Sequence, residues 1–356
     1  MAEKQVVLVT SVLVLALTPA LVFADQPFVG VDDHGSLVLN PPAGGQVVVD
    51  GVVFQSLLDR LDAVERQLAE QECRVVADTD TITGIGEELE GGKWQGGVLV
   101  KGKIYCIPRR SESVLIIDPT TNTADTTAIT GLSGRNKWMG GVLAGNGKVY
   151  GIPWYSTSVL IIDPATNTTD TTSITGFGSG FDMWLGGVLA GNGKIYAIPF
   201  DSASVLIIDP ATNTTDNRTI AGFTGINKWA GGVLKGDGRI YGVPCDSESV
   251  LIIDPATNTA DTTTITGLSG NGKWIGGVLA GNGKLYGIPF HSNSVLIVDL
   301  ATNTADTTSI TGLMGGAKWQ GGVLAGDGKV YGMPWGSTSV LIIDPATNTT
   351  DTTTIT

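Results

Sequence analysis

One sequence unit occurs six times in this chain of 356 residues. Each copy opens on a tryptophan, and successive tryptophans are 44, 46, 45, 45 and 45 residues apart: Trp94, Trp138, Trp184, Trp229, Trp274 and Trp319. Self-similarity at a period of about 40 to 50 residues is typical of repeat architectures, and this length suits four short strands per unit. A repeated scaffold is chiefly structure, so function is to be sought where the copies differ.

Each copy divides into four segments of strand-like composition, as the second copy shows. Residues 138–143 (WMGGVL) and 149–153 (VYGIP) flank a Gly-Asn-Gly-Lys turn, and Asn-Gly favours hairpins because both residues accept positive φ at low cost. Residues 158–163 (SVLIID) form an apolar run typical of a strand covered on both faces. After a Pro-Ala-Thr-Asn turn, residues 168–175 are rich in Thr and Asp, which suits the exposed outer edge of a sheet.

Four antiparallel strands repeated around a ring are the blade pattern of an all-β propeller. We therefore expect a β-propeller of about six four-stranded blades over residues 78–356. A β-solenoid normally uses shorter coils and does not need a polar fourth strand. Helical repeats are excluded by the alternating Thr, Val and Ile residues and by the many Asn-Gly and Asp-Gly turns.

The number of blades is ambiguous at the ends of the repeat region. The first three strands occur six times, but the Thr-rich fourth strand occurs seven times, because residues 78–83 (DTDTIT) precede the first tryptophan. Residues 351–356 at the C-terminus compete with that copy for the outer position of the last blade. We favour six blades; seven is the alternative if residues 25–51 supply strands for another.

The repeat also resembles a known family. Residues 191–215 (GNGKIYAIPFDSASVLIIDPATNTT) are similar to the YVTN-type β-propeller repeat of secreted and surface-layer-associated proteins. The likeness recurs in every unit, but Ile-Pro stands where that family often has Thr-Asn, and the Thr-rich outer strand is longer. The resemblance implies a propeller that binds or displays, and it carries no catalytic residues to this chain.

The first residues match an export signal. Lys4 precedes an apolar stretch over residues 6–22, and Val22-Phe23-Ala24 matches a cleavage site before Asp25. An uncleaved anchor is the lesser alternative, because 17 residues are marginal for spanning a bilayer. We expect a signal peptide over residues 1–24 and a secreted or cell-surface product with no membrane segment after cleavage.

A short β/turn segment over residues 25–53 and an amphipathic helix over residues 54–74 are expected next. The apolar residues of that helix follow the a/d spacing of a heptad: Phe54, Leu57, Leu61, Val64 and Leu68. Two heptads fit a helix packed on the repeat domain as well as a stalk that makes a homo-oligomer. In the second case Cys73, just beyond the stripe, could bridge chains.

Charge and the scarcity of reactive residues exclude several functions. The formal net charge is -13 and no run of Lys or Arg occurs, which argues against nucleic-acid partners. The two histidines, His34 and His291, have no motif partners, so we expect no catalytic triad, metal site or cofactor. The three cysteines, with Cys106 and Cys245 in the repeats, lack metal-ligand spacing and are odd in number for a disulfide framework.

The copies differ in two connections and agree in the other two. The first-to-second and third-to-fourth turns barely change, whereas the fourth-to-first link and the second-to-third loop vary. Strands one and three run the same way, so we expect both variable connections on one face of the ring. The second-to-third loops read, in order, Arg109-Arg110, Trp154-Tyr155, Phe200-Asp201, Cys245-Asp246, Phe290-His291 and Trp335-Gly336.

We take these loop residues, apart from Cys245 and Gly336, as candidate ligand contacts, since aromatic rings with polar neighbours suit sugars and peptides. Packing between blades is the competing interpretation, and we favour it for the invariant tryptophans. The predicted function is a secreted, non-enzymatic recognition or adhesion module for an extracellular glycan or protein. The alternatives are a hydrolase or lyase with a channel site and a purely structural wall or matrix protein. Acceptor sequons for N-glycosylation occur at Asn167, Asn213, Asn217 and Asn348.

Overall fold

A computed structural model describes residues 81–82, 92–177 and 184–355, together with the short strands of the N-terminal part. The chain divides into two compact units, Met1–Val76 and Ala77–Thr356. The strands of the first unit pair antiparallel as β1 with β2, β3 with β6, β6 with β7, and β4 with β5. They are β1 (Val6–Val9), β2 (Val12–Leu15), β3 (Val22–Phe23), β4 (Val29–Val31), β5 (Leu37–Leu39), β6 (Val47–Val49) and β7 (Val52–Val53).

Two predictions for this first unit lie outside the described residues. They are the helix over residues 54–74, with its neighbour Cys73, and the cleavage site between Ala24 and Asp25. Over the residues that the structure does describe, no helix reaches the length and apolarity that crossing a bilayer demands.

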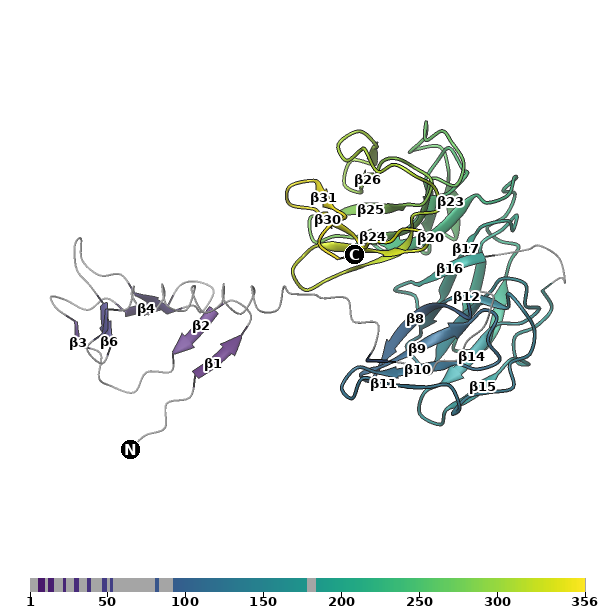
Figure 1. Cartoon of the computed structure of the whole chain (residues 1–356), viewed down its shortest axis with the longest axis horizontal. Helices are drawn as coiled ribbons and strands as arrows, with labels where there is room; N and C mark the ends of the chain where they lie inside the picture. Colours follow the sequence, from purple (N-terminus) through teal and green to yellow (C-terminus); the bar gives the residue numbers. More distant parts are fainter. Residues whose placement is uncertain are drawn as a thin grey trace. The chain divides into compact units, whose positions relative to one another are not determined.

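The second unit consists of six four-stranded antiparallel sheets, so the predicted six-bladed propeller is confirmed (Figure 1). Each blade takes its strands in sequence order from the axis outward. The blades are β8 (Trp94–Val100), β9 (Lys103–Pro108), β10 (Leu115–Asp118), β11 (Thr123–Asp125); β12 (Trp138–Leu143), β13 (Val149–Pro153), β14 (Leu160–Asp163), β15 (Thr168–Asp170); β16 (Trp184–Leu189), β17 (Ile195–Pro199), β18 (Leu206–Asp209), β19 (Thr214–Asp216); β20 (Trp229–Leu234), β21 (Ile240–Pro244), β22 (Leu251–Asp254), β23 (Thr259–Asp261); β24 (Trp274–Leu279), β25 (Lys284–Pro289), β26 (Leu296–Asp299), β27 (Thr304–Asp306); β28 (Trp319–Leu324), β29 (Val330–Pro334), β30 (Leu341–Asp344) and β31 (Thr349–Asp351).

The outer strand is shorter than the sequence predicted. In the second blade it ends at Asp170, whereas the prediction continued it to Thr175. The reason is that the Asp170 carboxylate accepts hydrogen bonds from the backbone N–H groups of Thr172 and Ser173, at 2.7 and 3.0 Å. Such an Asp-led turn competes with the strand ladder for the backbone donors, and it turns the chain away from the sheet edge.

The core lies between blades. One buried cluster joins Tyr150 and Ile152 of the second blade to Trp184, Ile195 and Leu206 of the third, and four further clusters repeat this arrangement around the unit. Because each of the four middle blades buries one face against the preceding blade and the other against the following one, the third strand is apolar on both sides, as its sequence predicted.

Paired glycines bring the inner strands together at the axis. Gly140 has a φ of +83°, and a Cβ atom built on it would lie 3.0 Å from the Cα atom of Gly186 in the next blade. Gly186, Gly231 and Gly276 repeat this backbone-to-backbone approach. Only glycine fits both the positive φ and the close contact, so glycine backbone lines the axis.

The last blade is completed by the C-terminal copy of the outer strand. β31 pairs with β30, which resolves the competition noted in the sequence. Of the N-terminal copy the structure describes Thr81 and Ile82, and neither lies in a strand. The inner strands pack in the order β8, β12, β16, β20, β24, β28, and among the described strands β28 and β8 are not a packed pair of that kind. The six blades form an open arc (Figure 1).

Candidate functional site

The variable connections lie on one face, as the sequence predicted. The backbone N–H of Lys228, in the link into the fourth blade, donates to the carbonyl of Phe200 in the loop of the third blade at 2.8 Å. Lys273 and Lys318 repeat this bond to Cys245 and Phe290, each at 3.0 Å. Each second-to-third loop therefore contacts the link that enters the next blade. We call this surface the variable face.

The uniform turns meet on the opposite face, where they also join neighbouring blades. The Tyr150 hydroxyl donates to Asn213 Oδ1 at 3.3 Å, and Asn146 Nδ2 donates to the Pro210 carbonyl at 3.2 Å. In the fourth blade Asp237 replaces that turn asparagine. Lys235 bonds to Asp237 at 2.9 Å and reaches the Leu300 carbonyl of the next blade at 2.7 Å, which preserves the bridge.

A buried lysine joins blades beneath the variable face. Lys273 is 4% exposed, and its ammonium group donates to the carbonyls of Cys245, Ser247 and Gly270 at 2.8, 3.0 and 2.6 Å. It also lies 5.8 Å from the centre of the Trp274 ring, within cation–π range. Desolvation by burial lowers the pKa of Lys273 from its usual value.

Sequence reasoning missed this lysine, although a signal was present. Lys precedes the repeat tryptophan in five of six copies, and Met183 stands at that position in the third. The tryptophans themselves act as interblade wedges, because Trp138, Trp184, Trp229, Trp274 and Trp319 are 2–4% exposed. Each of these indole N–H groups donates to a serine carbonyl 20 residues on, as Trp274 does to Ser294 at 2.8 Å.

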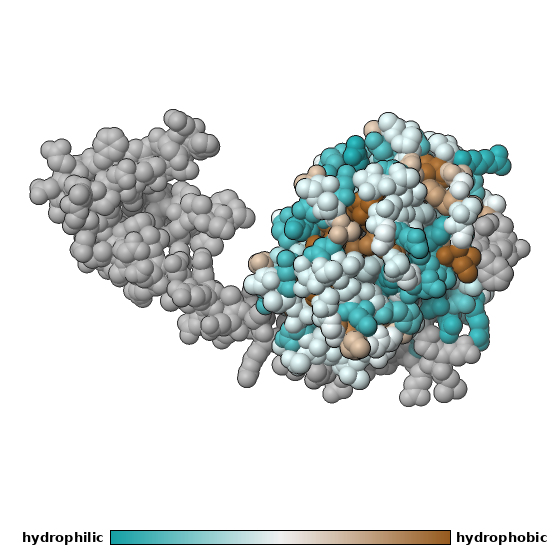
Figure 2. Space-filling view, turned by 90° about the horizontal axis from the view of Figure 1, so that it is seen from above, coloured by the Kyte–Doolittle hydropathy of each residue, from teal (hydrophilic) through white to brown (hydrophobic). Residues whose placement is uncertain are grey.

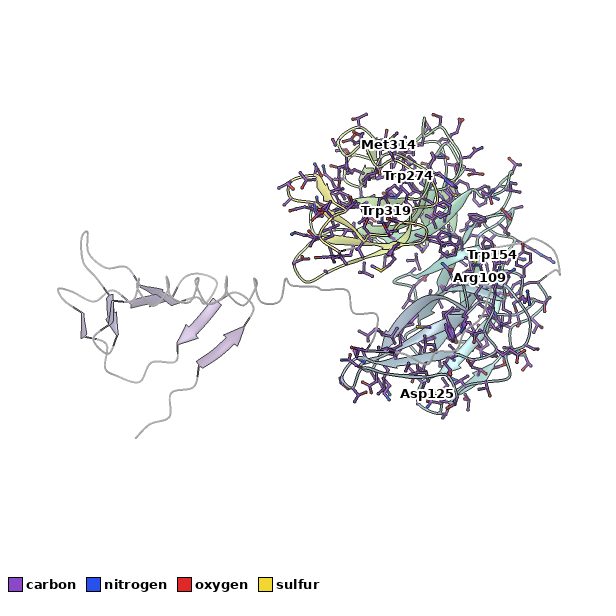
Figure 3. All side chains as sticks on the ribbon, in the orientation of Figure 1. Arg109, Asp125, Trp154, Trp274, Met314 and Trp319 are labelled. Carbon is purple, nitrogen blue, oxygen red and sulfur yellow. The ribbon has the colours of Figure 1, made fainter. Side chains whose placement is uncertain are left out.

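The first residue of each variable loop points toward the next blade. Phe200 and Phe290 are half-buried and pack with Ala230, Cys245 and Ile275 in one apolar cluster. Trp154 is also half-buried, and its ring centre lies 5.0 Å from that of Phe200. Arg109, the counterpart of Trp154 in the first blade, buries its Nε atom without a hydrogen-bond partner among the described residues (Figure 3). Trp335 is the exception, at 50% exposure.

The second residue of each loop fixes the following link. Asp201 accepts a hydrogen bond from the Asn227 backbone N–H at 2.6 Å, and Asp246 accepts one from Gly272 at 2.5 Å. His291 does the same through Nδ1, from Ala317 at 3.1 Å. Arg110 instead donates from Nε to the Asn136 side chain at 3.2 Å. Tyr155 is 42% exposed.

The two repeat cysteines are protected thiols. Burial raises the pKa of Cys106 to about 11, and burial together with the nearby Asp246 carboxylate raises the pKa of Cys245 to about 12. Both are free in the structure. Because the thiolate is the reactive form, neither residue suits nucleophilic or metal-binding chemistry near neutral pH.

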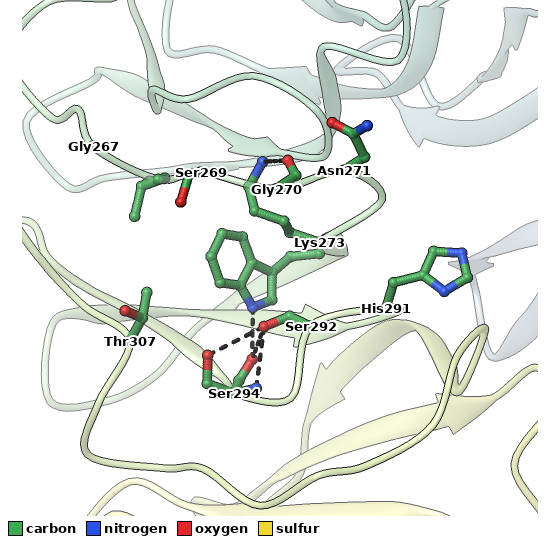
Figure 4. A pocket seen from close by; sticks show the side chains of 11 residues that line it. Gly267, Ser269, Gly270, Asn271, Lys273, His291, Ser292, Ser294 and Thr307 are labelled. Carbon is green, nitrogen blue, oxygen red and sulfur yellow. Dashed lines mark hydrogen bonds between the residues drawn. The ribbon is translucent and has the colours of Figure 1, made fainter.

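Two equivalent hollows open on the variable face, in the fourth and fifth blades. Their volumes are about 340 and 270 Å³, near the lower end for small-molecule sites. The hollow of the fifth blade is lined by Trp274 and by residues with hydroxyl groups from the link, the loop and the outer connection (Figure 4). Its polar lining includes Ser269, Asn271, His291, Ser292, Ser294 and Thr307.

The described surface of the second unit that Figure 2 shows is mostly polar, with scattered apolar patches. Among the residues whose side chains the structure describes, no three His, Cys, Asp or Glu residues come together as metal ligands would. The hollows offer hydroxyl groups beside an indole ring, with Lys273 in the fifth blade and with Lys228 and Asp246 in the fourth. The ammonium groups of both lysines are already bonded to backbone carbonyls, so the remaining chemistry suits a hydroxylated ligand.

The comparisons with known proteins show the fold. No protein-family model matches the chain, and no curated protein matches its sequence. Virginiamycin B lyase from Staphylococcus aureus has a similar structure, with a TM-score of 0.59 at 9% identity over 73% of this chain and 83% of the lyase. The extracellular domain of a hybrid two-component system from B. thetaiotaomicron gives 0.59 at 10% identity over 78% of this chain and 38% of that protein. Hydrazine synthase from Kuenenia stuttgartiensis gives 0.51 at 14% identity over 74% of this chain and 80% of that one.

Proposed function

We propose that this protein is an extracellular recognition or adhesion module that binds a glycan or protein ligand through its variable face. The observation that carries the proposal is the separation of the connections: those that differ between copies gather on one face, and those that agree gather on the other. Exchanging loop residues on a constant scaffold is how rigid folds generate binding specificity.

The leading ligand contacts lie in the first two blades. Tyr155 is exposed beside Trp154, with ring centres 6.2 Å apart, and Arg109 and Arg110 are the cationic residues of the second-to-third loops. An exposed phenol, a guanidinium and an aromatic edge together suit a hydroxylated ligand that carries an acidic group. The hollows of the later blades would hold neutral sugar units, so several weak contacts would add to one useful affinity.

A binding role is favoured over a channel enzyme by the composition of the axis. The six described inner strands meet there through glycine backbone, and none of these strands contains an acidic residue, a histidine, a serine or a threonine. An affiliation with the YVTN-type repeat family, a secreted location and oligomerisation through residues 54–74 belong to the same proposal. They rest on the sequence and on an extracellular domain among the structural neighbours.

The test is a glycan array probed with the full chain and two classes of variant. Tyr155→Ala and Arg110→Ala on the variable face should weaken binding about tenfold or more, equivalent to roughly 1.4 kcal/mol each. Lys148→Ala, at an exposed site on the uniform face, is the matched control and should bind as the parent does. Absence of binding to every glycan and to extracellular-matrix proteins, or equal losses on both faces, would overturn the proposal.

A further inference from the structure

Three of the variable loops hold the link into the next blade through one side chain, and in the fifth blade that side chain is a histidine. His291 Nδ1 accepts a hydrogen bond from the backbone N–H of Ala317 at 3.1 Å. At the same position, the third and fourth blades use the carboxylates of Asp201 and Asp246. Because a ring nitrogen that accepts a hydrogen bond carries no proton, the bond to Ala317 requires a neutral imidazole with its proton on Nε2.

The glycines on either side of His291 make room for its ring. A Cβ atom on Gly272 would overlap the imidazole, and one on Gly316 would lie 2.8 Å from Nδ1. The links into the second and fourth blades carry larger side chains at these two positions: Asn136 and Asn227 correspond to Gly272, and Arg135 and Ile226 correspond to Gly316. The imidazole therefore occupies space that both adjoining links leave free, as part of a matched set of replacements.

The residue that His291 holds is in a strained conformation. Ala317 has a φ of +51°, in the left-handed region that glycine and asparagine tolerate better than alanine. Its counterparts in the other described links are all glycine or asparagine: Gly92, Asn136, Asn227 and Gly272. The Ala317 N–H donates to His291, and its carbonyl accepts from the Gly336 N–H at 2.8 Å. Without the bond to His291, less would hold Ala317 in this conformation.

Charged groups of the described residues also lie on the segments packed against His291. Lys273 and Lys318 each donate from the ammonium group to three backbone carbonyls, which keeps both protonated. Asp246 accepts from the Gly272 N–H at 2.5 Å. The usual pKa of aspartate is about 3.9 and that of histidine about 6.5. Histidine is therefore the residue type of this cluster that changes charge between about pH 7.5 and pH 5.

We propose that protonation of His291 releases the link over residues 313–317, so that the variable face around the fifth-blade hollow differs between neutral and mildly acidic pH. A protonated Nδ1 is a donor and meets the Ala317 N–H, which is also a donor, so the bond is lost. The release is local, because Lys318 and Trp319 behind the link are buried. His291 also lines the hollow, on the side opposite Thr307 (Figure 4). Control of ligand binding by this release rests on the proposed function.

Hydrogen exchange tests the release without a ligand. The full chain is labelled in deuterium at about pH 7.5 and pH 5, and each exchange rate is divided by that of an unstructured peptide of the same sequence at the same pH. The protection of the Ala317 amide should fall about fivefold at the lower pH, as expected for the loss of one hydrogen bond. The Asn227 amide, which donates to Asp201, is the internal reference and should keep its protection.

Two variants at position 291 complete this test. His291→Asp supplies the acceptor that the third and fourth blades use, and it should protect the Ala317 amide equally at both pH values. His291→Ala removes the acceptor and should leave that amide weakly protected at both. Equal protection of the parent at the two pH values would overturn the proposal, as would a fall of the same size in His291→Asp.

A glycan array read at the same two pH values extends the test to binding. Glycans that the parent binds at the higher pH should bind several-fold more weakly at the lower one, and His291→Asp should lose this difference. Equal binding by the parent at both pH values would refute control of the site by His291. An array without any signal would refute the proposed function alone, because the exchange measurement still decides whether the link is released.

Discussion

Lys273 shows how a single side chain can hold three parts of this molecule. Its ammonium group collects carbonyls from the loop of one blade and from the link into the next, so the charge is solvated by backbone instead of water. A buried charge is tolerated only when it is bonded in this way. The sequence made the neighbouring tryptophan conspicuous, and the lysine ammonium lies 5.8 Å from the centre of that ring.

Replacing this lysine should cost stability. We expect Lys273→Met to lower the free energy of unfolding by about 2 to 3 kcal/mol, because hydrogen bonds to charged groups are lost and buried carbonyls are left without a donor. Lys284→Met is the control in the same blade. Its ammonium lies 3.7 Å from Asp299 in an exposed pair that contributes about 0 to 1 kcal/mol. Urea titrations would compare the two, and equal losses would contradict the assigned role.

The third copy offers the reverse experiment. Met183, outside the described residues, occupies the lysine position of the sequence, and the corresponding loop carbonyls belong to Trp154 and Ser156. Met183→Lys should raise the melting temperature by about 2 to 4 °C, since roughly 1 kcal/mol shifts a domain of this size by that amount. Calorimetry would measure the shift. An unchanged or lower melting temperature would show that a lysine in this blade does not bond to the loop carbonyls.

Among the elements, the outer strand of each blade limits the exposed sheet edge and ends at a negatively charged aspartate. Each is three residues long and ends at an aspartate that is bonded by following N–H and hydroxyl groups, which removes strand edge available to another chain. Asp261 is typical: hydrogen bonds from Thr264 and Thr263, the largest from the Thr264 hydroxyl, lower its pKa to about 2. The pKa values of Asp170, Asp306 and Asp351 are likewise lowered to about 2.

These turns predict how stability depends on pH. An aspartate has a pKa of about 3.9 in an unfolded chain, so the ionised folded form stabilises the protein above that value. The stabilisation is lost as pH falls through the interval from about 4 to 2. We expect a melting temperature that stays level near neutral pH and falls steeply in that interval, measured by circular dichroism. Asp261→Asn should reduce the size of the fall, and an unchanged profile in this variant would contradict the assignment.

The strands could be predicted from the sequence because the same pattern occurs in every copy. Turn chemistry and the apolar third strand placed the four strands of each blade, and antiparallel order placed the variable connections on one face. The predicted length of the outer strand was wrong because the residues after Asp170 can either continue the strand or form a turn. Hydrogen bonds to the Asp170 carboxylate favour the turn. The burial of the loop residues could not be predicted from the sequence either. Phe200 and Tyr155 are both aromatic, yet Phe200 packs against the next blade and Tyr155 is exposed.

At the scale of the whole molecule, the second compact unit is held together by interfaces between its own blades. Every buried cluster that the structure describes lies within residues 77–356; five lie between consecutive blades and the sixth joins the third, fourth and fifth blades. The number of blades could therefore be predicted by counting copies. The identity of the outer strand in the last blade could not be predicted, because two near-identical segments compete for that position. The pairing of β30 with β31 decides between them.

The independence of this unit can be tested by truncation. Residues 77–356 expressed alone should fold with a melting temperature within about 3 °C of the full chain, because single-domain stability resides in the buried core. The measurement is thermal unfolding followed by tryptophan fluorescence, which reports on the buried indoles. A truncated chain that is unfolded, or that melts far lower, would show that the first unit contributes to the stability of the second.

The paired replacement at Lys235 and Asp237 has a genetic consequence. Recombination between near-identical copies can insert or delete a whole unit and still leave consecutive blades with matching surfaces, because every unit carries both sides of the interface. A crossover falling between these two codons would instead transfer the acid without the lysine that reaches Leu300, and the hybrid would lose that bridge. Each compensated pair of this kind therefore restricts where exchanges between copies can occur.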